Sequence, residues 1–164
     1  MAIARQAPQR VTRLCLMSTN AYEPSRSQRS AWSAQRAALA AGASARDVQS
    51  SLLPLLLSPV VLRECADLVE LTLDMADDIG AATLDAQLRL QATRIDERPD
   101  LTQLRCPTLI VAARDDALCN VDRHVEMAAL IPGSELVILE RCAHLSPLER
   151  PEQISDHLAR WRGW

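Results

Sequence analysis

The chain is 164 residues long, which is enough for one domain with a substantial hydrophobic core. Its formal net charge is -3 and 24 % of its residues are charged, so neither nucleic acid nor an anionic membrane surface is expected as a partner. The most apolar stretch, residues 52–62, is interrupted by Pro54 and Pro59 and is too short to cross a bilayer. The opening residues lack the apolar run of a secretory signal peptide. Five cysteines without a C-x-x-C pair indicate reduced thiols and a cytoplasmic protein.

The first part of the chain predicts a helix over residues 1–7 and a short buried strand over residues 14–18, LCLMS. A continuous apolar run bounded by turn residues is typical of a strand covered on both faces. The next part, residues 20–100, is rich in Ala, Leu and Arg and poor in β-branched residues, which favours helices. The expected helices cover residues 27–41, 45–57, 59–78 and 81–93, with the last two either separate or joined across a break at Gly80.

Within residues 59–78, six side chains recur at helical spacing, and we interpret this stripe as core packing. The stripe consists of Val61, Cys65, Leu68, Val69, Thr72 and Met75. Residues 98–100, Arg-Pro-Asp, are expected to close this helical part as a turn.

The last part of the chain predicts a strand over residues 107–113, a helix over 121–130, a strand over 134–140 and a helix over 151–161. Strand and helix alternating at these lengths is typical of a parallel βαβα unit with right-handed crossovers. Functional sites of open parallel sheets lie in the loops beyond the carboxyl ends of the strands. Those loops here carry Arg-Asp-Asp-Ala at residues 114–117 and Arg-Cys-Ala-His at residues 141–144.

The two loops bring an acidic residue, Asp115 or Asp116, close to His144, and these are the candidate catalytic residues. A carboxylate beside an imidazole fixes the tautomer of the ring and stabilises the imidazolium that forms during proton transfer. The alternative is that these loop side chains are solvated surface groups without a catalytic role.

The segments CPTLIVAARDDAL and IPGSELVILERCAHLSPLERPEQI resemble the ending of α/β-hydrolases. That family shows Pro-Thr-Leu, a strand, G-x-x-D, a helix, a second strand, and G-H followed by a Glu-x-Pro helix start. The resemblance implies that Asp116 is the catalytic acid and His144 the catalytic histidine, and it makes the neighbouring Asp115 the second choice of acid. The sequence departs from the pattern at Ala113 and Ala143, which replace glycines, and at Cys119-Asn120, which replaces a proline.

The resemblance extends to ARQAPQRVTRLCLMST, which is similar to the helix and strand that follow the family's nucleophile elbow. It implies an α/β class and a partial α/β-hydrolase fold of three parallel strands with flanking helices. Residues 1–19 and 101–164 would form the partial core, and residues 20–100 an inserted helical lid. No cofactor is implied.

The nucleophile that the resemblance requires is not found in these residues. The elbow motif is G-x-S-x-G, and none of the four glycines lies in such a motif. Cys119 and Cys142 lie near the candidate acid and histidine in sequence, but neither occupies an elbow, so a Cys–His nucleophile is disfavoured. A metal site from Cys119, Cys142, His144 and Asp116 is disfavoured by the ligand spacing. The other histidines, His124 and His157, are interpreted as surface or packing residues.

The expected function is therefore hydrolysis of an ester-like bond, a carboxylic ester or a lactone, in a partly apolar small molecule by a Ser-His-Asp mechanism. The chain would be the N-terminally truncated part of such an enzyme and inactive alone. Two alternatives remain: a non-catalytic binding module of the same fold, or one half of a split enzyme. Truncation would expose an edge of the strand at residues 14–18 and promote self-association.

Overall fold

The computed structural model describes residues 1–162, which group into two compact units. The sheet unit comprises Met1–Ala21, Leu55–Ser58 and the described residues from Glu97 onward, and the helical unit comprises Tyr22–Pro54 and Pro59–Asp96. Each unit is considered separately below. No helix among the described residues has the length and apolar character needed to span a bilayer.

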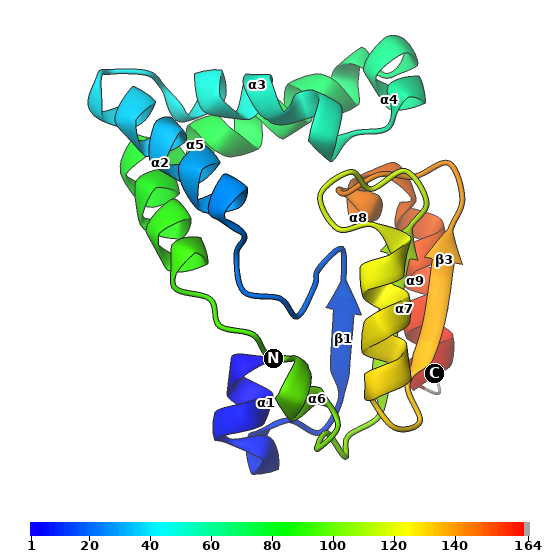
Figure 1. Cartoon of the computed structure of the whole chain (residues 1–164). Coiled ribbons are helices and arrows are strands. Elements are labelled where there is room, and N and C mark those ends of the chain that lie inside the picture. The colour runs from blue at the N-terminus through cyan, green and yellow to red at the C-terminus, as the bar shows by residue number, and fades with distance from the viewer. Residues whose placement is uncertain (163–164) are drawn as a thin grey trace. The chain divides into compact units, whose positions relative to one another are not determined.

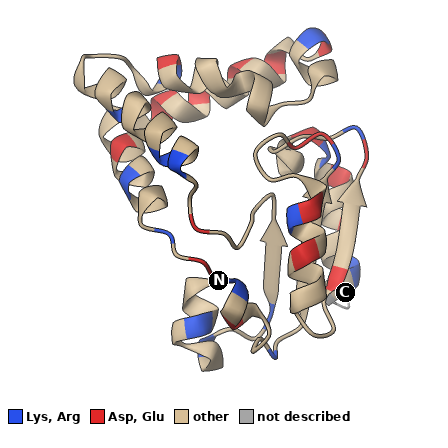
Figure 2. Cartoon of the chain, in the orientation of Figure 1, with Lys and Arg blue, Asp and Glu red and all other residues tan. Residues whose placement is uncertain are grey.

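The sheet unit contains three parallel strands in the order β1-β2-β3 (Figure 1). They are β1 (Leu14–Met17), β2 (Thr108–Ala113) and β3 (Glu135–Leu139). All six residues of the central strand are buried and none is charged, and Figure 2 shows that β1 carries no charged residue either. This explains why β2 reads as an unbroken apolar run in the sequence, since both of its faces are covered by helices.

Helices cover both faces of this sheet (Figure 1). On one face, Leu16 and Ile110 pack with Met127 and Ile131 at α7 (Val121–Leu130), and α1 (Ala2–Gln6) and α6 (Arg98–Leu101) add apolar residues to the same cluster. The alternate side chains of β2 pack on the opposite face, where α9 (Pro151–Arg162) contributes Ile154. Two shorter helices complete the unit, the 3-10 turn Pro8–Arg10 and α8 (Ser146–Glu149). Three parallel strands with flanking helices are thus confirmed.

The helical unit consists of α2 (Arg26–Ala40), α3 (Ala45–Leu56), α4 (Pro59–Glu64) and α5 (Ala66–Ala92), with α2 and α4 packed on α5. Helix α2 begins with a capping box, in which Ser25 and Gln28 each accept a hydrogen bond from the other's backbone amide. Helix α5 is kinked at Gly80, whose φ of 71° and ψ of 166° are available essentially only to glycine. The break expected at Gly80 is therefore present.

Three local expectations differ from the structure. The helix expected over residues 59–78 is interrupted at Cys65, because α4 ends at Glu64 and α5 starts a new helical phase at Ala66. Cys65 is consequently exposed and Met75 is 45 % exposed, so the stripe is core only in part. The turn expected at residues 98–100 is the start of α6, with Pro99 in its first turn, and α8 was not anticipated.

Residues 55–58 also differ, since the sequence assigns them to the lid whereas they group with the sheet unit. The carbonyl of Leu56 accepts a hydrogen bond from the amide of Leu145 at 3.0 Å. The amide of Ser58, which is 1 % exposed, donates to Oε1 of Glu149 at 2.9 Å. These bonds attach the segment to the loop that follows β3.

Strand β1 has no strand partner on its outer edge among the described residues. The amides of Leu14 and Ser18 donate toward β2, so alternation directs the amides of Cys15 and Met17 to the outer edge. We predict that the chain self-associates through this edge and that Cys15→Pro, which removes one outer amide, shifts the population toward monomer. Sedimentation velocity over a range of concentrations measures the effect.

Cys15→Ala is the matched control, because it removes the same side chain but keeps the amide, and it should associate like the wild type. A wild-type chain that stays monomeric at all concentrations would contradict the prediction. Circular dichroism of the three proteins checks that the fold is retained.

Candidate active site

The carboxyl ends of β2 and β3 lie side by side, and the loops that follow them are hydrogen-bonded to each other. The amide of Arg114 donates to the carbonyl of Leu139, and the amide of Asp115 to the carbonyl of Cys142, both at 2.9 Å. In addition to these backbone bonds, the Arg114 guanidinium forms an ion pair with the Glu140 carboxylate at 2.8 Å. The parallel register is thus extended beyond the strands, and it fixes the position of one loop relative to the other.

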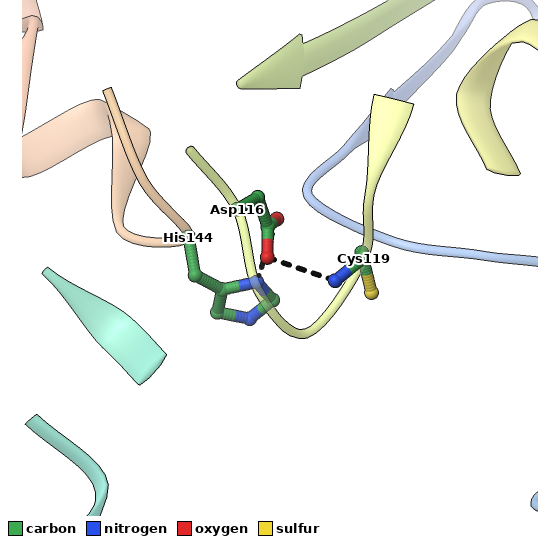
Figure 3. A group of neighbouring side chains, drawn as sticks. All are labelled: Asp116, Cys119 and His144. Carbon is green, nitrogen blue, oxygen red and sulfur yellow. Dashed lines mark hydrogen bonds and ion pairs between the residues drawn. The ribbon is translucent and has the colours of Figure 1, made fainter. Parts of the chain in front are cut away.

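Asp116 and His144, the two candidate catalytic residues, are joined by a hydrogen bond (Figure 3). Nδ1 of His144 lies 2.9 Å from Oδ2 of Asp116. The other carboxylate oxygen, Oδ1, accepts the amides of Leu118 and Cys119, each at 2.8 Å. The Asp116 carboxylate is fully buried and the His144 side chain is 23 % exposed. A proton on Nδ1 facing the carboxylate leaves the lone pair of the neutral ring on Nε2, as a general base requires.

Asp115, the second choice of acid, is exposed, whereas Asp116 is 3 % exposed. The geometry therefore favours Asp116 as the partner of the imidazole. The alanines that replace the family's glycines also fit, because the described non-glycine residues with positive φ are Ser18 and Arg141, and not Ala113 or Ala143. An L-residue is accommodated at both positions without left-handed backbone strain.

The backbone on both sides of His144 is held by hydrogen bonds that the sequence did not reveal. The amide of Ala143 donates to Oε1 of Glu149 at 3.3 Å, and the amide of Leu145 donates to the carbonyl of Leu56. Glu149 is 7 % exposed, and its Oε1 also accepts the Ser58 amide, while its buried Oε2 has no hydrogen-bond partner among the described residues. Glu149 thus fixes the loop that carries the imidazole.

His124, interpreted from the sequence as a surface or packing residue, is fully buried beside this site. Its Nε2 accepts the amide of Thr19 at 3.2 Å, so its Nδ1 carries the proton that is donated to the carbonyl of Asn120 at 3.0 Å. Burial lowers the pKa of His124, and the nearby charges of Asp116 and His144 have smaller, opposed effects. The neutral ring connects the end of β1 to the start of α7. His157 is half-buried on α9.

The two cysteines near the pair differ in their surroundings. Cys142 is completely buried, and burial, followed by the charge of Glu149, raises the pKa of its thiol to about 12, which makes it a poor nucleophile near neutral pH. Cys119 is 7 % exposed, and its Sγ, a carboxylate oxygen of Asp116 and a ring nitrogen of His144 all lie within 4.8 Å of one another. Three of the four residues considered as metal ligands therefore meet, although their spacing in the sequence gave no sign of it.

Comparison with known proteins identifies a protein family that matches almost the whole chain. The model of the alpha/beta hydrolase family matches residues 1–157. The RutD protein of Rhizobium rhizogenes, whose name assigns it carbamate hydrolysis, is 35 % identical over 72 residues, which are 44 % of this chain and 27 % of RutD.

Solved structures match nearly the whole chain, as two examples show. An esterase from Thermogutta terrifontis has a TM-score of 0.86 at 25 % identity, covering 98 % of this chain and 58 % of the esterase. The enol-lactonase from Burkholderia xenovorans shares the fold with a TM-score of 0.87 at 17 % identity, covering 99 % of this chain and 60 % of the lactonase. In RutD and in both structures, the match spans less than two thirds of the relative's own length.

The low pKa of His124 predicts a stability that depends on pH. The unfolded chain binds a proton on this ring below about pH 6.5, whereas the folded chain binds it only at a lower pH, so the free energy of unfolding falls as pH falls through 6.5. One such group contributes a slope of at most about 1.4 kcal/mol per pH unit. His124→Gln, which retains an acceptor and a donor, should flatten the slope, as measured by urea unfolding between pH 5.5 and 7.5. His157→Gln is the control, and an unchanged slope in His124→Gln would refute the prediction.

Glu149 provides the second prediction for this site. Glu149→Ala leaves the buried amides of Ser58 and Ala143 without their acceptor, so the free energy of unfolding should fall by about 1–3 kcal/mol. Glu149→Gln keeps the accepting oxygen and should lose less. Urea unfolding at pH 7 measures both. The exposed Glu152 offers a matched control, since Glu152→Ala should change stability by no more than about 0.5 kcal/mol. Equal losses of stability in Glu149→Ala and Glu152→Ala would contradict the role of Glu149 in holding the loop of His144.

Proposed function

Because this chain belongs to the alpha/beta hydrolase family, we propose that it supplies the acid and the base of an enzyme that hydrolyses an ester-like bond, a carboxylic ester or a lactone. The observation that supports this proposal most strongly is the 2.9 Å hydrogen bond between buried Asp116 and the partly exposed imidazole of His144. The pair lies at the carboxyl ends of adjacent parallel strands, where sites of open α/β sheets are found.

In the proposed mechanism, Nε2 of His144 accepts the proton of a serine hydroxyl as the serine oxygen attacks the carbonyl carbon of the substrate. The resulting imidazolium then donates this proton to the leaving alkoxide, and an acyl-enzyme remains. In the second half, His144 takes a proton from water, the hydroxide attacks the acyl carbon, and the serine is released with the proton returned. Asp116 stays ionised throughout and stabilises the imidazolium through Oδ2.

The serine of this mechanism is proposed to lie outside the 164 residues. The chain contains no G-x-S-x-G motif, and it spans 58 % of the length of the esterase that it matches. On this view the chain alone has no hydrolase activity, and the longer protein that includes the elbow is the enzyme.

The helical unit is proposed to act as the lid that shapes the substrate site. Its helix α5 exposes Leu71, Met75 and Ile79 at successive turns, with exposed fractions of 46 %, 45 % and 37 %. Side chains of this kind suit a partly apolar substrate. The substrate class is accordingly a small ester or lactone with an apolar portion.

A second candidate is favoured by the absence of an elbow motif from the sequence: a non-catalytic binding module, or one half of a split enzyme. The coding sequence upstream of the Met1 codon distinguishes these from the first proposal. A continuous reading frame through G-x-S-x-G and further strands supports the single-chain hydrolase. A stop codon with a co-purifying partner that carries the motif supports the split enzyme, and a stop codon without such a partner supports the binding module.

We predict that Asp116→Ala and His144→Ala, introduced into the protein that carries the nucleophile, each lower kcat for 4-nitrophenyl acetate by roughly 10³- to 10⁴-fold. His144→Ala removes the proton acceptor, and Asp116→Ala removes the carboxylate that orients it. Initial rates over a range of substrate concentrations separate kcat from KM.

Asp115→Ala is the matched control, because this neighbouring carboxylate is exposed while Asp116 is buried. It should leave kcat within about threefold of the wild type, the size of effect expected for a surface change. Full activity in both Asp116→Ala and His144→Ala would show that the site is assigned wrongly.

A further inference from the structure

Cys119 places a thiol next to the Asp116–His144 pair, and the proposed hydrolase mechanism makes no use of it. Figure 3 shows the three side chains together. The sulfur, a ring nitrogen and a carboxylate oxygen lie within 4.8 Å of one another, and Cys119 is 7 % exposed. The backbone amide of Cys119 donates to Asp116 at 2.8 Å, which holds the residue against the carboxylate.

We propose that Asp116, Cys119 and His144 form a binding site for a thiophilic divalent cation of the Zn²⁺ class, and that the bound cation withdraws His144 from acid–base chemistry. The donor atoms are one thiolate sulfur, one imidazole nitrogen and one carboxylate oxygen, the set that zinc takes in proteins. Three protein ligands leave the fourth tetrahedral position for water. Hard cations such as Mg²⁺ are disfavoured, because they prefer oxygen ligands.

The surroundings of the cluster fit a ligand set. Asp116 uses Oδ1 for two backbone amides, so Oδ2 is the oxygen that faces His144. The Cys119 sulfur lies 3.4 Å from Nδ2 of Asn20, a buried amide that donates to it and stabilises negative charge on a thiolate. Tetrahedral zinc holds its ligand atoms roughly 3.5 Å apart, and the three donor atoms here all lie within 4.8 Å of one another.

Metal binding and acid–base chemistry exclude each other at this imidazole. If Nδ1 binds the cation, it must lose the proton that it shares with Asp116. If Nε2 binds the cation, the lone pair that would accept a proton is used in the metal bond. The zinc-binding part of the inference goes beyond the proposed hydrolase function and requires only residues within this chain, whereas the withdrawal of His144 from acid–base chemistry rests on that function.

The test is a titration of the purified chain with Zn²⁺ alone, in competition with a chromophoric zinc chelator. We expect one Zn²⁺ per chain, and Cys119→Ser should weaken binding at least tenfold. Cys65→Ser is the matched control, because Cys65 is exposed and far outside the cluster in sequence, and it should bind Zn²⁺ like the wild type. Unchanged affinity in Cys119→Ser, or a loss of equal size in Cys65→Ser, would overturn the proposal.

X-ray absorption of the zinc-loaded wild-type chain gives a second readout, which stands even if Cys119→Ser does not fold. We expect one sulfur at about 2.3 Å and two or three nitrogen or oxygen ligands at about 2.0–2.2 Å. A first coordination shell without sulfur, or with two sulfurs, would exclude this site. Neither measurement requires turnover, so an inactive chain that binds zinc separates this inference from the proposed function.

Discussion

The parallel pairing of β2 with β3 is the constraint on which the candidate site depends. Ala113 is in register with Leu139, and the amides of the two following residues continue the pairing into the loops. Residues along a strand advance by about 3.3 Å each, so a slip of one position would exceed the whole length of the hydrogen bond between Asp116 and His144. The burial of all six β2 residues opposes such a slip, because it would move the strand's side chains to the opposite faces.

The surroundings of Asp116 are as important as its position. A buried carboxylate is tolerated only when its oxygens are hydrogen-bonded, and here two amides and one imidazole satisfy it. The same burial makes the interaction with His144 stronger than it would be in water. Nearby, burial disfavours the charged forms of other groups, since it raises the pKa of the Cys142 thiol and lowers the pKa of His124.

The sequence predicted the sheet unit more accurately than the helical unit, for a physical reason. Helix α7 occupies the predicted residues 121–130, and the strands differ by one or two residues at their ends, because each is a short apolar run between turn residues. Asp116 and His144 could be anticipated because parallel topology joins loops at one edge of a sheet. The prediction that the stripe along residues 61–75 packs in the core was only partly correct, because the helix breaks at Cys65 and a new helix begins at Ala66.

Contacts between distant residues could not be predicted. Glu149 accepts a hydrogen bond from the amide of Ser58, which is 91 positions away in the sequence, and His124 accepts one from the amide of Thr19, which is 105 positions away. Spacing rules for metal ligands likewise apply to turns and helices, whereas Cys119 and His144 meet through the pairing of two strands.

Residues 55–58 interrupt the helical unit in the sequence, because they belong to the sheet unit. The chain passes between the two units at four points, on either side of this segment and at the two ends of the helical unit. Residues 55–58 thus form a short segment of the sheet unit between two segments of the helical unit. This short segment is hydrogen-bonded to Leu145 and Glu149, the residues that hold the loop of His144. These two hydrogen bonds fasten the stretch of chain between α3 and α4 to the loop that carries the imidazole, so a segment about ninety residues away in the sequence helps to hold His144 in place.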